Sequence, residues 1–162
     1  MEENKLKLNN DKTEAIRFSS PSSTSTTLPY PQIISLSNTD VEFSGTARNL
    51  GFIFDSALSV KQHIIKTCKA AYIKIRRISS IRQYLTEDAT KTLVNPVQIR
   101  LLQFPTGRLS TDRHHTLQQV QNSAAKLILK FHRAEHAKPL LKQLHWLPIE
   151  QRIKYKIACF CY

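Results

Sequence analysis

The sequence contains little glycine, cysteine, methionine and tryptophan. Of its 162 residues, three are Gly, three are Cys, one is Met and one is Trp. Neither a GxGxxG motif nor a P-loop occurs, so the glycine-cradled phosphate sites of dinucleotide-binding and ATP-binding proteins are not expected. The three cysteines, Cys68, Cys159 and Cys161, are too few for a disulfide framework and are typical of a reducing compartment.

Long apolar runs are also absent. No stretch approaches the roughly 20 apolar residues that a membrane-spanning helix needs. The first five residues are polar or charged after Met1, and they lack the apolar centre of a secretory signal. We therefore expect an intracellular protein, nuclear or cytoplasmic, that is neither secreted nor bound to a membrane.

Positive charge is concentrated in the later part of the chain. Residues 1–45 hold four Lys and Arg against six Asp and Glu, a net −2. Residues 46–162 hold twenty Lys and Arg against six Asp and Glu, a net +14. Such a field favours polyanionic partners, and nucleic acid is the commonest of these. The alternative explanation is a surface charge that serves solubility alone.

Alternating polar and apolar residues predict short strands in the first third of the chain. Four segments carry this pattern or a compact apolar run: residues 13–19, 33–36, 41–43 and 50–54. The Ser-, Thr- and Pro-rich stretch 20–31 is expected to be a loop. Strands this short are marginally stable unless they pack on something. We predict a small antiparallel sheet over residues 1–55.

Helical spacing replaces strand spacing after residue 55. One long amphipathic helix is predicted over residues 60–85, with Thr86 capping the next helix and Pro96 ending it near Val94. Further helices are expected after Asp112, Pro139 and Pro148. The predicted fold class is therefore α+β, and the residues expected to be mostly buried are Leu50, Ile53, Ile64, Cys68, Ala71, Ile75, Ile78, Leu93, Val120, Ala124, Leu127, Trp146, Ile153 and Ile157.

The long helix is expected to carry a strip of positive charge opposite its apolar stripe. No Asp or Glu occurs between Asp55 and Glu87. The cations predicted on this face are Lys66, Lys69, Lys74, Arg76 and Arg77. Such side chains can contact phosphates without reading sequence, although a solvated surface is the simpler explanation for any one of them. Tyr72 and Tyr84 could stack on bases or pack at the edge of the core.

Four stretches, in this order, together resemble the reverse transcriptases of non-LTR (LINE-type) retrotransposons. They are LKLNNDKTEAIRF at 6–18, the segment from ARNLGFIFD to RQYLT at 47–86, LQQVQNSAAKLIL at 117–129 and HAKPLLKQLHWLPIEQRIKYKI at 136–157. The resemblance implies that residues 1–55 are a remnant of the palm edge and residues 56–162 a helical, thumb-like region. Residues 95–116 depart from the family pattern, as decayed or misjoined sequence would.

The resemblance also implies roles for individual residues. Lys12 matches a lysine near the incoming nucleotide, where a cation can protonate or stabilise the leaving pyrophosphate. An exposed lysine in a turn is the alternative. Asn49, Leu50 and Gly51 match the hairpin that grips the primer end, and Gly51 would allow close backbone approach or mark a bulge. Asp55 is expected to cap the following helix. The helix over 60–85 matches the start of the thumb, whose helices follow the template–primer backbone.

The sequence does not match the segments that carry the catalytic carboxylates in reverse transcriptases of this family. Two-metal catalysis needs paired carboxylates, and the Tyr/Phe-Ala-Asp-Asp turn of the family does not occur; the adjacent acids are Glu2-Glu3 and Glu87-Asp88. We therefore expect an incomplete domain that is not an enzyme by itself and lacks the palm and fingers of the parent polymerase. No cofactor is expected in this fragment, because Mg²⁺ is implied only for the complete parent enzyme.

Two other functions stay open beside that of a reverse transcriptase remnant that binds nucleic acid weakly. One is a non-enzymatic nucleic-acid or protein binding module recruited by the host, and the other is a pseudogene product without function. No metal site is predicted: His132 and His136 are four residues apart, but HRAEH is not HExxH, and Cys159 with Cys161 forms only a weak CxC pattern.

Overall fold

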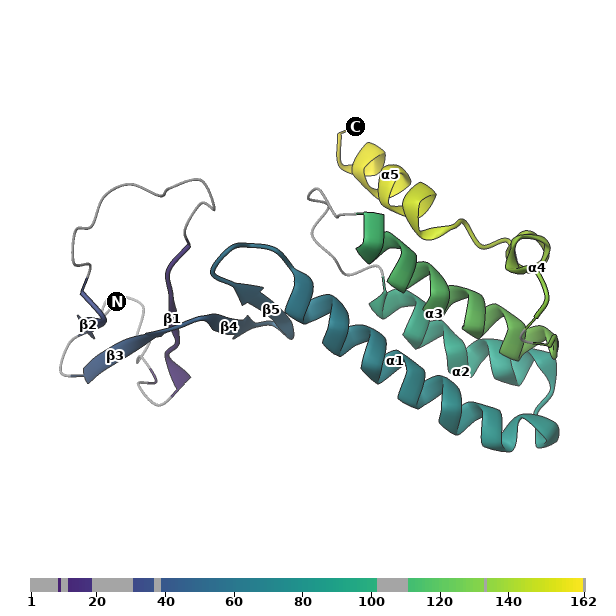
Figure 1. Ribbon diagram of the computed structural model, residues 1–162. Helices are drawn as coiled ribbons and strands as arrows, with labels where there is room; N and C mark the ends of the chain where they lie inside the picture. Colours follow the sequence, from purple (N-terminus) through teal and green to yellow (C-terminus); the bar gives the residue numbers. More distant parts are fainter. Residues whose placement is uncertain are drawn as a thin grey trace. The chain divides into compact units, whose positions relative to one another are not determined.

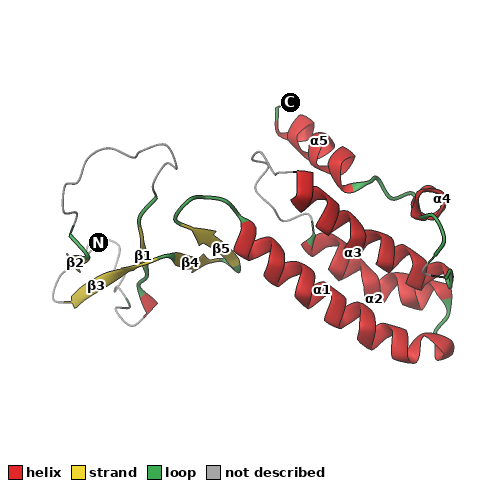
Figure 2. Ribbon diagram, viewed as in Figure 1, coloured by secondary structure: helices red, strands yellow, loops and turns green. Residues whose placement is uncertain are grey.

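The computed structural model describes residue 9 and residues 12–18, 31–36, 39–101, 111–132 and 134–161. The chain forms two compact units, Met1–His63 and Ile64–Tyr162 (Figure 1). In the described part of the chain, the strands lie in the first unit and are followed by five α-helices; Figure 2 distinguishes strands from helices by colour. The predicted α+β class is therefore confirmed. The assignment of residues 1–55 and 56–162 to parts of a polymerase stays a prediction.

The first unit contains a three-stranded sheet in the order β1-β3-β2. Strand β3 (Thr39–Ser44) lies in the centre, and β2 (Ile33–Leu36) pairs with it in antiparallel register. Strand β1 (Ala15–Ile16) is shorter than predicted and pairs with β3 in parallel. The predicted antiparallel arrangement thus holds for β2 and β3 but not for β1. The loop predicted over 20–31 lies, apart from Pro31, outside the described residues.

A tight hairpin joins β4 (Thr46–Asn49) to β5 (Phe52–Asp55). Its two loop residues, Leu50 and Gly51, both have positive φ, at 48° and 84°. This is the backbone of a type I′ turn, whose twist suits the flanking strands. The prediction that Leu50 is buried in a strand was wrong: the turn places the side chain in solvent, where it is fully exposed.

Helix α1 (Lys61–Ile81) confirms the long amphipathic helix, and a 3-10 turn, η3 (Arg82–Tyr84), follows it. Five residues of its predicted apolar stripe are buried: Ile64, Cys68, Ala71, Ile75 and Ile78. Burial raises the pKa of the Cys68 thiol to about 11, so this thiol is protonated near neutral pH. Asp55 does not cap α1 directly; its carboxylate accepts hydrogen bonds from the N–H and hydroxyl of Ser59 in the preceding loop.

Helix α2 (Glu87–Arg100) begins as predicted, because the Thr86 hydroxyl accepts a hydrogen bond from the N–H of Ala89. The prediction that Pro96 ends this helix was wrong, since the helix continues four residues beyond it. Pro96 itself is exposed, while Val97 and Leu101 beyond it are almost completely buried. Burial of two apolar side chains offsets the roughly 3 kcal/mol that an internal proline costs.

Helix α3 (Thr111–Leu129) forms the centre of the second unit. It packs against α2, against α4 (Ala137–Gln143) and against α5 (Ile149–Phe160). Its completely buried apolar residues are Leu117, Val120, Ala124, Ala125 and Ile128. The stretch 95–116, which departs from the family pattern, is divided between two helices. Residues 95–100 belong to α2, residues 111–116 belong to α3, and residues 102–110 lie outside the described part.

The remaining predicted core residues are less buried than expected. Leu93 and Ile157 are exposed, and four others are only half-buried: Ile53, Leu127, Trp146 and Ile153. In α2 the buried face runs through Thr90, Val94 and Val97, which excludes Leu93. Helix α5 contacts mainly α3. No helix in the described part of the chain is long and apolar enough to cross a membrane.

Candidate nucleic-acid interface

Helix α1 exposes all five of the cations predicted to face a partner. Lys66, Lys69, Lys74, Arg76 and Arg77 are exposed along it, in a stretch without Asp or Glu. The acids nearest in sequence on the C-terminal side are Glu87 and Asp88, and both pair with Lys91 at the start of α2. The field along α1 is therefore positive over its whole exposed side.

The five side chains do not form one line. With 100° of rotation per residue, they spread over roughly 160° of the helix circumference. Lys66, Lys69 and Arg77 occupy the middle of this arc and form what we call the outward ridge. Arg76 lies toward α3 and Lys74 toward α2. A single nucleic-acid backbone can therefore contact the outward ridge together with one flank, but not both flanks at once.

Apolar side chains interrupt the predicted basic strip. Ile65, Ile73 and Ile81 repeat every eight residues on the exposed side, and each is about half exposed. The expectation of a continuous basic strip was therefore wrong. With 100° of rotation per residue, a step of eight residues turns by about 80°, so these three side chains are spread around the exposed side and do not form a line of their own.

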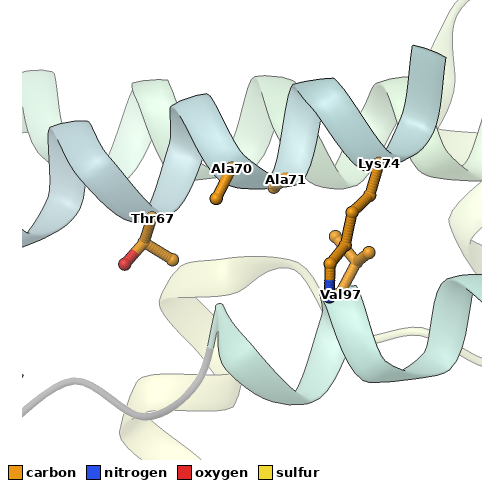
Figure 3. A pocket seen from close by; sticks show the side chains of 5 residues that line it. All are labelled: Thr67, Ala70, Ala71, Lys74 and Val97. Atoms are coloured by element: carbon orange, nitrogen blue, oxygen red, sulfur yellow. The ribbon is translucent and has the colours of Figure 1, made fainter. Parts of the chain in front are cut away.

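Lys74 lies beside a small hollow between α1 and α2. Figure 3 shows its side chain reaching from α1 toward Val97 of α2, and the other lining residues are Thr67, Ala70 and Ala71. Because the neighbours are small or apolar, the methylene groups of Lys74 cover this seam while the ammonium group stays near solvent. Lys74 thus has a packing role that the sequence pattern did not indicate.

An open groove lies between α1 and the C-terminal half of α3. Among the described residues that line it, four are cationic, two are aromatic and none is acidic. The cations are Arg76, Arg82, Lys126 and Lys130, and the aromatic residues are Tyr72 and Phe131. Only Arg76 belongs to the set predicted from the sequence.

Arg82 is buried and holds the end of α3. Its Nε donates to the carbonyl of Leu127 at 2.8 Å, and its Nη2 donates to that of Ile128 at 2.6 Å. Its Nη1 donates to the carbonyl of Leu85 at 2.7 Å. The last carbonyls of a helix have no partner within it and carry partial negative charge. Arg82 therefore satisfies and neutralises the C-terminal end of α3.

The C-terminus of α3 is completed by a left-handed residue. Lys130 has φ 58°, and the N–H of Phe131 donates to the carbonyl of Lys126 at 3.0 Å. This is the Schellman hydrogen bond, in which the residue with positive φ is usually glycine. The sharp turn brings Phe131 to the wall of the groove, next to the last turn of α3.

The residues matched to the polymerase chemistry lie in the first unit. Lys12 is exposed, and its N–H donates to the carbonyl of Asn9 in a short turn. Asn49, Leu50 and Gly51 lie at the tip of the β4–β5 hairpin. A Cβ on Gly51 would meet no atom within 4 Å, so the glycine serves the positive φ of the turn in this structure rather than a close approach.

No three His, Cys, Asp or Glu side chains gather as a metal site within the described residues. His132, His136, Cys159 and Cys161 are all exposed. Comparisons of the chain with protein-family models, with curated proteins and with solved structures found no match. The family assignment stays a prediction that rests on the four sequence stretches.

Proposed function

We propose that this chain is the C-terminal part of a LINE-type reverse transcriptase, comprising a palm edge and a thumb-like region. In this proposal it binds the nucleic-acid backbone without reading sequence, through the outward ridge of α1. The observation that carries the proposal is the acid-free, exposed row of cations on that helix. Residues 64–162 hold eighteen Lys and Arg against five Asp and Glu, a net +13, which strengthens the attraction for phosphate.

Binding of a primer–template duplex is expected to be weak and to fall steeply with salt concentration. Replacing Lys66, Lys69, Lys74, Arg76 and Arg77 by alanine removes the proposed contacts. Since only the three ridge cations and one flanking cation can reach one duplex, the slope of log K against log salt is expected to fall by about 3.6, which is about 0.9 for each of four phosphate contacts. Fluorescence anisotropy at several salt concentrations measures both the affinity and the slope.

A matched control removes the same charge from other helices. Alanine replaces five lysines of α2, α4 and α5: Lys91, Lys138, Lys142, Lys154 and Lys156. If net charge alone drives binding, the two variants lose affinity equally. If the outward ridge is the contact, the control changes the slope by less than about one. Equal affinity of the wild type and the α1 variant would contradict the proposal that the cations of α1 contact the duplex.

The chain by itself is expected not to polymerise DNA. Purified protein incubated with Mg²⁺, a primer–template and all four deoxynucleotides should leave the primer length unchanged, because no paired carboxylates are matched in the sequence. A known reverse transcriptase in parallel serves as the positive control. Any templated extension that survives repurification contradicts this part of the proposal.

The ancestry has a separate test in the genomic sequence before Met1. An in-frame Tyr/Phe-Ala-Asp-Asp turn there supports a piece of a working polymerase, whose palm and fingers would be the partners of this chain and whose carboxylates would bind Mg²⁺. Stop codons there support the alternatives, a host-recruited binding module or a pseudogene product. In each case we place the protein inside the cell, in the nucleus or cytoplasm, because its three cysteines are too few and too odd in number for a disulfide framework.

A further inference from the structure

We infer that the groove between α1 and α3 binds a single strand of nucleic acid, with phosphates on its cations and a base against its aromatic rings. The inference rests on the proposed nucleic-acid binding and adds a second site and a preferred form of ligand. Three cations line one groove, Arg76 from α1, Lys126 from α3 and Lys130 directly after α3, and the described residues of its lining include no acid.

Arg82 makes this groove compatible with phosphate. Without it, the free carbonyls at the end of α3 would repel an anion. Its guanidinium group donates to two of those carbonyls, at Leu127 and Ile128, and so removes the repulsion. Arg82 is thus a positioning residue, and the phosphate contacts fall to the three cations nearer to solvent.

The aromatic rings determine which form of nucleic acid the groove prefers. Tyr72 is 40% exposed and Phe131 is 42% exposed, and they come from α1 and from the turn after α3. Unpaired bases stack on such rings, whereas the bases of a duplex are already stacked inside the helix and present only their edges. Cations beside exposed rings therefore favour a single strand over a duplex.

The test uses the full chain with fluorescein-labelled oligothymidylate and oligouridylate of about 12 nucleotides and a duplex of equal length. The wild type is expected to bind the single strands more tightly than the duplex. Tyr72→Leu and Phe131→Leu keep apolar bulk but remove the ring, and each is expected to weaken single-strand binding about tenfold at constant salt. Tyr84→Leu is the matched control, since Tyr84 is 80% exposed and lies outside the groove.

Lys130→Gly separates loss of binding from loss of folding. The positive φ of Lys130 suits glycine better than lysine, so the melting temperature is expected to stay equal or rise. Single-strand affinity is expected to fall, and the salt slope to decrease by about 0.7, for one lost phosphate contact. A variant that is more stable but binds less tightly cannot have lost affinity by unfolding.

The outcomes distinguish the two proposals. Unchanged single-strand affinity in both ring variants overturns the groove, whatever the α1 ridge does with duplex. A variant that replaces only Lys66, Lys69 and Arg77 by alanine removes the outward ridge and keeps Arg76 of the groove. Weakened single-strand binding in the ring variants, together with unchanged duplex affinity in this ridge variant, overturns the ridge and leaves the groove. Absence of binding to all three probes overturns both.

Discussion

Replacing Arg82 by alanine is expected to lower the free energy of unfolding by about 3 kcal/mol. Arg82 is the buried arginine among the described residues of the second unit, so this is the largest loss of stability expected from removing one charged side chain there. The side chain is 8% exposed and donates to three carbonyls from two separate segments. Hydrogen bonds from a charged donor contribute about 1.5–3 kcal/mol each. In the variant, part of the lost stability is regained because water can donate hydrogen bonds to the released carbonyls.

Two variants control for the size and the charge of Arg82. Arg82→Lys keeps the charge but cannot present three donors in a plane, so it is expected to lose about half as much stability. Arg77→Ala removes an exposed arginine from the same region and is expected to change stability by less than about 0.5 kcal/mol. Urea unfolding followed by circular dichroism gives all three values. An Arg82→Ala variant as stable as Arg77→Ala would show that the three hydrogen bonds contribute nothing.

Replacing Gln121 by alanine is expected to cost about 2 kcal/mol. This side chain is completely buried; its Nε2 donates to the carbonyl of Leu147 at 3.0 Å, and its Oε1 accepts from Gln118 at 2.9 Å. Gln118 in turn accepts the N–H of Ile149 at 2.9 Å. Since Pro148 provides no side-chain cap, α3 itself caps the first turn of α5. The two glutamines therefore attach the start of α5 to α3.

The attachment predicts a local effect that a general loss of stability would not give. Hydrogen exchange in the Gln121→Ala variant is expected to accelerate most in α5, while α1 keeps its protection. Gln119→Ala is the matched control, because Gln119 is exposed on the same helix. Uniform acceleration over all five helices would contradict the tethering role. Protection of α5 that matches the wild type would contradict it as well.

The same two glutamines link two of the four matched stretches. Gln118 and Gln121 belong to the third matched stretch, and Leu147 and Ile149 belong to the fourth. In this fold the LHWLP segment is a structural junction, and His145 in it is exposed. Helical spacing could reveal neither contact, since donor and acceptor are separated by 26 and 31 residues.

Local rules predicted much of the fold. The period of the apolar stripe located α1, and the Thr86 cap located the start of α2. The errors occur where tertiary packing or turn geometry overrides such rules. Pro96 continues a helix because the residues beyond it are buried, and Leu50 leaves the sheet because the two-residue loop needs positive φ at both positions.

The candidate site was only partly visible in the sequence. Exposure of the five α1 cations followed from their spacing, but their division between an outward ridge and two flanks depends on where α2 and α3 pack. Lys126 and Lys130 lie about fifty residues after Arg76, so no local pattern joins them to it. The basic residues near the end of the apolar stripe of α3, among them Lys126 and Lys130, are a signal for the helix end.

The first unit buries very little. Val41 is the one apolar side chain among its described residues that is buried, while Ile33, Ile34 and Leu36 of β2 are all exposed. Among the described residues, most of the apolar burial that stabilises the fold therefore lies in residues 64–162. Substitutions in the sheet and hairpin consequently cost little folding energy. Under selection for folding alone, the two units would diverge at different rates, with the strands changing faster than the helices.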